Sequence, residues 1–203
     1  MDTKLYLLPI QKASEKEESY HTRYFPDRLQ RAKSFSLEDV RLRCLAGSIL
    51  LHEVLGLEES QVQIQPGGKP VAPGFGREFN LSHSGEYAVL AVSEFPVGVD
   101  IELCSLRHVK AAKKAYTDAE LQWMNEDAEN RFTLLWTMKE SVSKVFGLGL
   151  RMKFSDFDVL PLLRGDALSI RGETLYGKTL PLPGYSLSVC AAGELGEVSV
   201  HEL

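Results

Sequence analysis

Residues 79–102 read FNLSHSGEYAVLAVSEFPVGVDIE, and this stretch decides the fold. Tyr87–Ser93 is an apolar run of strand length, and Pro96 ends the extended segment that follows it. Val97–Glu102 then alternates with a period of two, which places its two acids on one face of a second strand and its branched apolar residues on the other. The stretch therefore predicts two consecutive strands, with the join between two lobes near Pro96.

Helices are predicted on both sides of this stretch. Ser36 is the expected N-cap of a helix that ends at Gly56, with apolar residues spaced along one face. Thr117 and Glu120 form a capping-box pattern that starts another helix, and a longer one covers residues 132–146. The chain thus combines helices with strands that are close neighbours in sequence.

Strand-like runs make up much of the remaining sequence, at residues 4–8, 62–65, 157–160, 167–170, 185–190 and 198–202. This mixture gives the class α+β. Each half of the chain opens on helix-rich sequence and finishes in strands. We therefore expect two similar-sized, pseudo-symmetric lobes, residues 1–96 and 97–203, each a small antiparallel sheet packed with helices.

The composition excludes several classes of protein. The 203 residues carry 23 Lys and Arg against 28 Asp and Glu, a net charge of −5, which argues against nucleic-acid binding by clustered cations. No apolar run approaches the roughly 20 residues that span a bilayer, and the first residues lack a secretory signal. We expect a cytoplasmic protein without a membrane partner. The three scattered cysteines argue against a disulfide framework.

Asp100 and Glu102 are the first candidate site residues. Two like charges on one strand face would repel by about 4 kcal/mol at roughly 4 Å if the effective dielectric constant is near 20. A bound cation would relieve this repulsion, and carboxylate oxygens suit Mg²⁺ better than zinc. The alternative is an exposed edge strand with solvated charges.

A second candidate group lies on the predicted helix 132–146. Glu140 and Lys144 are one turn apart and continue a stripe that begins with Phe132 and Trp136. The alternative is an ordinary helical ion pair. Lys139, beside them, is expected to point to solvent.

His83 and several basic residues could hold phosphates. His83 lies between two serines, where an imidazole and hydroxyl groups would donate to an anion, although an ordinary turn histidine is the alternative. Arg28 and Arg31 precede the first long helix, and Lys69 follows two glycines; a solvated helix face is the alternative for the arginines. The glycines fit neither a Walker nor a Rossmann pattern.

Four motifs together resemble the 4′-phosphopantetheinyl transferases, in particular the larger, single-chain subclass of the surfactin-synthetase activating type. The series spans about residues 68–144, and beyond about residue 160 the resemblance rests on length and strand-like texture. The motifs are Gly68-Lys69-Pro70, Asn80-Leu81-Ser82-His83-Ser84, Gly98-Val99-Asp100-Ile101-Glu102, and Trp136-Thr137-Met138-Lys139-Glu140-Ser141 with Lys144.

The resemblance implies transfer of the phosphopantetheine arm of coenzyme A to a serine of an acyl, peptidyl or aryl carrier protein, with Mg²⁺ as cofactor. It implies that Asp100, Glu102 and Glu140 bind the metal and that Glu140 is also the general base. Lys144 is then catalytic and reaches the phosphates. The remaining coenzyme A contacts that it implies are Arg28, Arg31, Lys69, Ser82 and His83.

Coenzyme A is accordingly expected to contact the first lobe, and the metal and carrier protein the second. Residues 104–116 are the candidate docking segment for the carrier, and we expect a monomer. Two other functions stay open. One is a non-catalytic module that binds coenzyme A or a nucleotide, and the other is a Mg²⁺-dependent phosphohydrolase.

Overall fold

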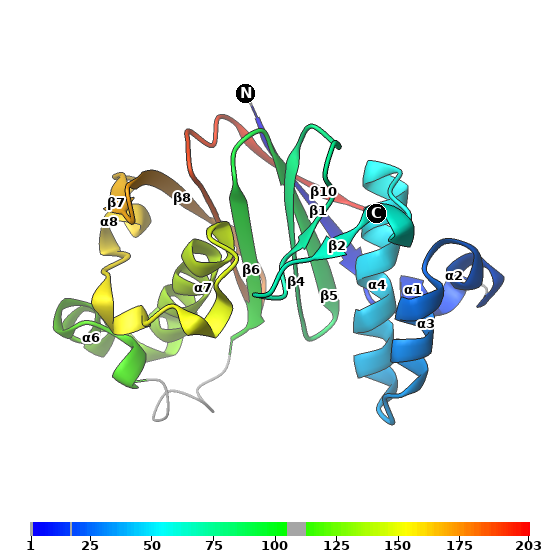
Figure 1. The fold of residues 1–203 in the computed structure, drawn as a ribbon. Coiled ribbons are helices and arrows are strands. Elements are labelled where there is room, and N and C mark those ends of the chain that lie inside the picture. Colours follow the sequence, from blue (N-terminus) through cyan, green and yellow to red (C-terminus); the bar gives the residue numbers. More distant parts are fainter. Residues whose placement is uncertain (1, 17, 105–112) are drawn as a thin grey trace.

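A computed structural model describes residues 2–16, 18–104 and 113–203. Two four-stranded sheets lie at the centre, with helices on both outer sides (Figure 1). The first sheet has the order β10-β1-β5-β4 and the second β6-β9-β8-β7. Their strands are β1 (Thr3–Pro9), β4 (Glu78–Ser84), β5 (Tyr87–Ser93), β6 (Val97–Leu103), β7 (Leu168–Ile170), β8 (Glu173–Leu182), β9 (Tyr185–Ala191) and β10 (Val198–Glu202).

The helices divide between the two sheets (Figure 1). A two-stranded ribbon of β2 (Gln63–Ile64) and β3 (Pro70–Val71) follows the first group, and short 3₁₀ turns connect several elements. The helices beside the first sheet are α1 (Lys12–Glu15), α2 (Glu18–Tyr24), α3 (Pro26–Lys33) and α4 (Glu38–Leu55). Those beside the second are α6 (Asp118–Asn125), α7 (Ala128–Val145) and α8 (Leu160–Leu163). The α+β class with two lobes is confirmed.

Strand β5 is buried on both faces, which explains why its sequence is apolar throughout instead of alternating. Ala88, Leu90 and Val92 belong to the core under α4. Val89 and Ala91 face the other way, into a core shared with the second sheet. A strand covered on both faces requires apolar residues at every position.

The second sheet is covered in the same way. Val99 and Ile101 of β6 are fully buried in the core between the sheets. On the opposite face α7 packs so closely on β6 that a Cβ added at Gly98 would lie 2.1 Å from the carbonyl oxygen of Ser141. This close approach brings the predicted helix stripe over the strand that carries the two acids.

Two predicted helix ends are confirmed and two predicted starts are wrong; one of these is the start predicted at residue 132, since α7 begins at Ala128. Gly56 ends α4 in the left-handed conformation, with φ of 68°. Thr117 caps α6 and forms a capping box with Glu120. The predicted N-cap Ser36 is wrong, because the N-cap position is Leu37 and makes no side-chain cap. The first-turn acids of α4 interact favourably with the helix dipole there.

The strand predicted at residues 157–160 is also wrong. The chain forms a 3₁₀ turn at Phe154–Asp156 and then α8, in whose first turn Pro161 lies. Proline fixes φ near the helical value and lacks the N–H that a strand needs, so it favours the start of a helix. Strand β8 was not predicted.

The last strand lies in the first sheet. β10 pairs in parallel with β1, with Thr3 opposite Val198, whereas the other ladders of the two large sheets are antiparallel in the described chain. The division into residues 1–96 and 97–203 stays a prediction, and β10 crosses it. Within the described ranges, no helix has the length and apolar character needed to cross a membrane.

Candidate active site

The edge strands of the two sheets meet through side chains. Alternate residues of β4 accept hydrogen bonds from alternate backbone N–H groups of β6. The amide oxygen of Asn80 accepts from Val99 at 3.0 Å. The hydroxyl oxygens of Ser82 and Ser84 accept from Ile101 and Leu103, at 3.5 and 3.1 Å. We call this set of contacts the seam.

Both acids of β6 lie beside the seam. Ser82 Oγ donates to Asp100 Oδ1 at 2.8 Å, and Ser84 Oγ donates to Glu102 Oε2 at 2.7 Å. Lys144 Nζ, from α7, also donates to Asp100 Oδ1 at 2.5 Å. The alternative of two solvated charges on an exposed strand does not hold for Asp100, whose exposed fraction is 3%.

A pocket of about 700 Å³ opens over the seam and takes residues from both lobes. α7 contributes Glu140 and Lys144, and β6 contributes the two acids. All the predicted site residues except Lys69 line this pocket: Arg28, Arg31, Ser82, His83, Asp100, Glu102, Glu140 and Lys144.

Arg28 reaches the pocket because its neighbour on α4 is a glycine. A Cβ added at Gly47 would lie 2.8 Å from Arg28 Nη1. The start of α3, which carries Arg28, is held by Glu59, whose carboxylate accepts from the backbone N–H groups of Asp27 and Arg28 at 2.7 and 3.0 Å. Burial lowers the pKa of Arg28, and the charge of Glu59 opposes this.

Lys69 does not line the pocket, although its neighbours Gly68 and Pro70 do. Its side chain is buried, and Nζ donates to the carbonyl oxygens of Val97 at 3.1 Å and Val145 at 3.3 Å. It therefore ties the turn before β3 to the start of β6 and the end of α7. Burial lowers the pKa of Lys69, with Glu78 opposing that effect.

Glu140 has an unusual environment for a carboxyl group. Burial, followed by the negative charge of Asp100, raises its pKa to about 7, with Glu102 adding to the shift and Lys144 opposing it. A carboxyl group whose pKa lies near neutrality can both accept and release a proton. The same crowding of negative charge favours binding of a cation.

The imidazole of His83 has a lowered pKa. Burial lowers its pKa, the positive charges of Lys144 and Arg43 lower it further, and Asp100 opposes them. Arg43 is fixed nearby by donating to the carbonyl oxygen of Gly85 at 2.9 Å. A phosphate group placed among these cations would favour the protonated imidazole.

The donor set of the pocket fits a divalent cation. Asp100, Glu102 and Glu140 supply carboxylate oxygens, which Mg²⁺ prefers. The Oδ2 atom of Asp100 is buried and has no hydrogen-bond partner, so it is available to a cation. Within residues 2–16, 18–104 and 113–203, no three Asp, Glu, His or Cys side chains already converge as a metal cluster.

Lys139 is a residue that the sequence prediction got wrong. Instead of pointing to solvent it has no exposed surface and pairs with Glu120 across 2.8 Å. Its Nζ also donates to the carbonyl oxygens of Phe154 and Phe157, at 2.7 and 2.6 Å, and Glu120 Oε1 accepts from the N–H of Val159 at 2.8 Å. The sequence pattern predicted Glu120 as part of the capping box of α6, and it does form that capping box. No sequence signal indicated its ion pair with Lys139.

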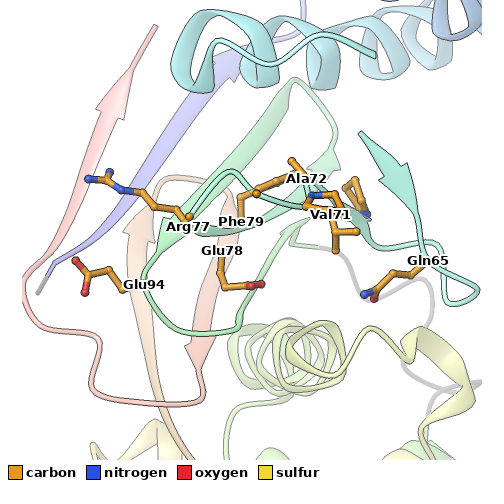
Figure 2. A pocket seen from close by; sticks show the side chains of 11 residues that line it. Gln65, Val71, Ala72, Arg77, Glu78, Phe79 and Glu94 are labelled. Carbon is orange, nitrogen blue, oxygen red and sulfur yellow. The ribbon is translucent and has the colours of Figure 1, made fainter. Parts of the chain in front are cut away.

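A second pocket, of about 330 Å³, contains none of the predicted site residues. Figure 2 shows Arg77, Glu78 and Glu94 around it, with Gln65 on its other side. Its walls come from Gln65, β3, the loop that follows it, the start of β4 and the residue after β5. Most of the predicted carrier-docking segment, residues 105–112, lies outside the described residues.

Comparisons with known proteins identify the family. A model of the 4′-phosphopantetheinyl transferase superfamily matches residues 96–190. The 4′-phosphopantetheinyl transferase psf-1 of Bacillus pumilus is 33% identical over 181 residues, which cover 79% of this chain and 77% of that protein. The 4′-phosphopantetheinyl transferase Sfp of Bacillus subtilis (strain 168) is 29% identical over 196 residues, 89% of this chain and 87% of that protein.

A mammalian relative matches a shorter part. The L-aminoadipate-semialdehyde dehydrogenase-phosphopantetheinyl transferase of Mus musculus is 30% identical over 166 residues, 68% of this chain and 53% of that protein. The two bacterial matches cover 79% and 89% of this chain. The chain therefore belongs to the 4′-phosphopantetheinyl transferase superfamily and is an enzyme of the Sfp type.

Proposed function

We propose that this enzyme transfers the 4′-phosphopantetheine arm of coenzyme A to a serine of an acyl, peptidyl or aryl carrier protein, with Mg²⁺ as cofactor. The observation that carries the proposal is the single pocket at the seam. It combines cations from the first lobe with three acids and a lysine from the second. A pyrophosphate needs cations around it, and an attacking hydroxyl needs a base.

In the proposed reaction the serine oxygen attacks the phosphorus that carries the pantetheine arm. A new P–O bond forms, the bond to the bridging oxygen breaks, and adenosine 3′,5′-bisphosphate leaves. Glu140 accepts the serine proton, for which a pKa near 7 is suitable. Lys144 neutralises charge on the phosphates, while Arg28, Arg31, Ser82 and His83 hold the coenzyme A phosphates.

Asp100, Glu102 and Glu140 would hold the magnesium ion. When bound, Mg²⁺ neutralises negative charge on the pyrophosphate. The unpartnered Oδ2 of Asp100 supports this assignment from the protein side. Lys144 then shares Asp100 with the cation, since it already contacts Oδ1.

We propose further that the enzyme works as a monomer in the cytoplasm, with no nucleic-acid or membrane partner. Support for the cytoplasm comes from the cysteines at positions 44, 104 and 190, whose thiols are free.

Intact-mass spectrometry of apo carrier proteins, incubated with the enzyme, coenzyme A and Mg²⁺, tests the proposal. We expect one phosphopantetheine group per carrier with the wild type and none with Asp100→Asn. Glu94→Gln is a matched control, because it removes an exposed acid from the second pocket, and should stay active. Coenzyme A binding without any transfer across the carrier panel would instead indicate a non-catalytic module. Hydrolysis of coenzyme A without a carrier would indicate a phosphohydrolase.

A further inference from the structure

The seam residues of β4 differ in whether they can also donate a hydrogen bond to the acids of β6. The three seam residues of β4, Asn80, Ser82 and Ser84, each accept an N–H from β6, but only the two serines have an O–H to donate. Those hydroxyl groups donate to the acids, Ser82 to Asp100 and Ser84 to Glu102. The hydroxyl group of each serine therefore binds both the backbone of β6 and one of its two acids.

Ser84 is itself rigidly placed. The turn that follows it is held from two sides: Arg43 of α4 donates to the carbonyl oxygen of Gly85, and the Tyr185 hydroxyl of β9 accepts from the N–H of Glu86 at 2.9 Å. There is no room for a side chain at Gly85, where an added Cβ would lie 2.3 Å from the Tyr185 oxygen. Gly85 also has a φ of 53°, which favours glycine.

Glu102 is more difficult to position than Asp100. A glutamate has one more side-chain torsion than an aspartate, and its carboxylate lies closer to the open end of β6, where Leu103 is 49% exposed. Asp100 is held by two partners, Ser82 and Lys144. For Glu102, the hydrogen bond from Ser84 supplies a corresponding restraint on one carboxylate oxygen.

We propose that Ser84 is a positioning residue that holds the Glu102 carboxylate toward the bound cation. This inference rests on the proposed function, in which Glu102 binds Mg²⁺. Ser84 does not line the pocket itself, whereas Glu102 does. Groups that orient metal ligands in this way typically change metal affinity by about 10–100-fold when they are removed.

Binding of Mn²⁺, used as a paramagnetic probe in the presence of coenzyme A, tests the inference without measuring activity. Ser84→Ala should weaken Mn²⁺ binding by about 10-fold, and Ser84→Thr, which keeps the hydroxyl, should restore it. Ser84→Cys is nearly isosteric and a poor donor, so it should resemble Ser84→Ala and serves if the alanine variant does not fold. The Kd for coenzyme A without metal should be unchanged in all three.

Asn80→Ala is the matched control. It removes a seam contact to β6 that involves no acid, and Mn²⁺ affinity should stay within about twofold of wild type while stability falls. An equal loss of affinity in Asn80→Ala would show that Ser84 acts only on the seam, and would overturn the inference. An Mn²⁺ affinity in Ser84→Ala equal to that of the wild type would also overturn the inference.

A double-mutant cycle tests whether Ser84 acts through Glu102. In the Glu102→Gln background, adding Ser84→Ala should not weaken Mn²⁺ binding further. An additive loss would contradict the inference. If the wild type binds no Mn²⁺ at all, the proposed metal site itself is wrong. If the wild type binds Mn²⁺ and Ser84→Ala binds it equally well, only the role of Ser84 is wrong.

Discussion

Lys139 of α7 and Glu120 of α6 form an ion pair with 2.8 Å between Nζ and Oε2, and neither side chain has any exposed surface. Both partners also bind the backbone of the segment 154–159. The pair therefore joins two helices and a loop directly behind the part of α7 that presents Glu140 to the pocket.

Lys139→Met should lower the free energy of unfolding by about 3–5 kcal/mol, because Glu120 is left as a buried charge without its partner. Urea denaturation followed by tryptophan fluorescence measures the loss. The double variant Lys139→Met/Glu120→Gln should lose less than the single variant, since no buried charge remains. A loss below about 1 kcal/mol in the single variant would contradict this description of the pair.

Lys69→Met should affect stability rather than coenzyme A binding. The carbonyl oxygens of Val97 and Val145 lose their donor, so we expect a loss of about 1–3 kcal/mol in unfolding free energy. Calorimetric titration should give a Kd for coenzyme A within about twofold of wild type. A loss of affinity above 10-fold with unchanged stability would restore Lys69 to the role that the family resemblance implies.

Glu140 gives the metal-free protein a pH-dependent stability. Its pKa is raised from 4.5 to about 7, so between these values the native state binds more protons than the unfolded state, and stability falls as pH rises. Between pH 4.5 and 7.5, wild type in EDTA should lose about 3 kcal/mol relative to Glu140→Gln. Parallel stability profiles for the two proteins would show that the carboxyl group titrates normally. In the transfer assay, Glu140→Gln should lower kcat by about 10²–10⁴-fold.

His83→Ala should raise the KM for coenzyme A and reduce the preference over 3′-dephospho-coenzyme A by about 10-fold, because a hydrogen bond to a charged phosphate is lost. Since the pKa of the unliganded imidazole is lowered, the wild-type preference should grow as pH falls from 8 to 6. The variant should show no such growth. An unchanged substrate ratio would mean that His83 is an ordinary turn residue.

Local sequence signals predicted much of the fold correctly. The capping box at Thr117 and the glycine at position 56 each fix a helix end through a few neighbouring atoms, and both are confirmed. The period of two in β6 correctly separated its acids from its apolar residues. The errors at Ser36 and at residues 157–160 are local, whereas the burial of Lys139 depends on distant contacts that no local pattern encodes.

The site shows the same division. Spacing placed the two acids on one face of β6 and Glu140 one turn from Lys144 on α7, and the family resemblance implied that they form one site. The pocket contains all four. Ser84 was quoted within a motif, but its link to Glu102 depends on the register between edge strands of two different sheets, which no local pattern encodes. The contacts of Lys69 could not be predicted for a related reason, since its acceptors are 28 and 76 residues away in sequence.

Coenzyme A binding to matched variants of the two pockets tests the central claim, that the seam pocket is the substrate site, most directly. Isothermal titration should show a loss of affinity of about 10-fold or more for both Arg28→Ala and Lys144→Ala, which lie on opposite lobes, because each removes a charged phosphate contact. Arg77→Ala, in the pocket of Figure 2, should bind as the wild type does. Unchanged binding in the first two variants, with a loss in Arg77→Ala, would place coenzyme A in the other pocket and contradict the account.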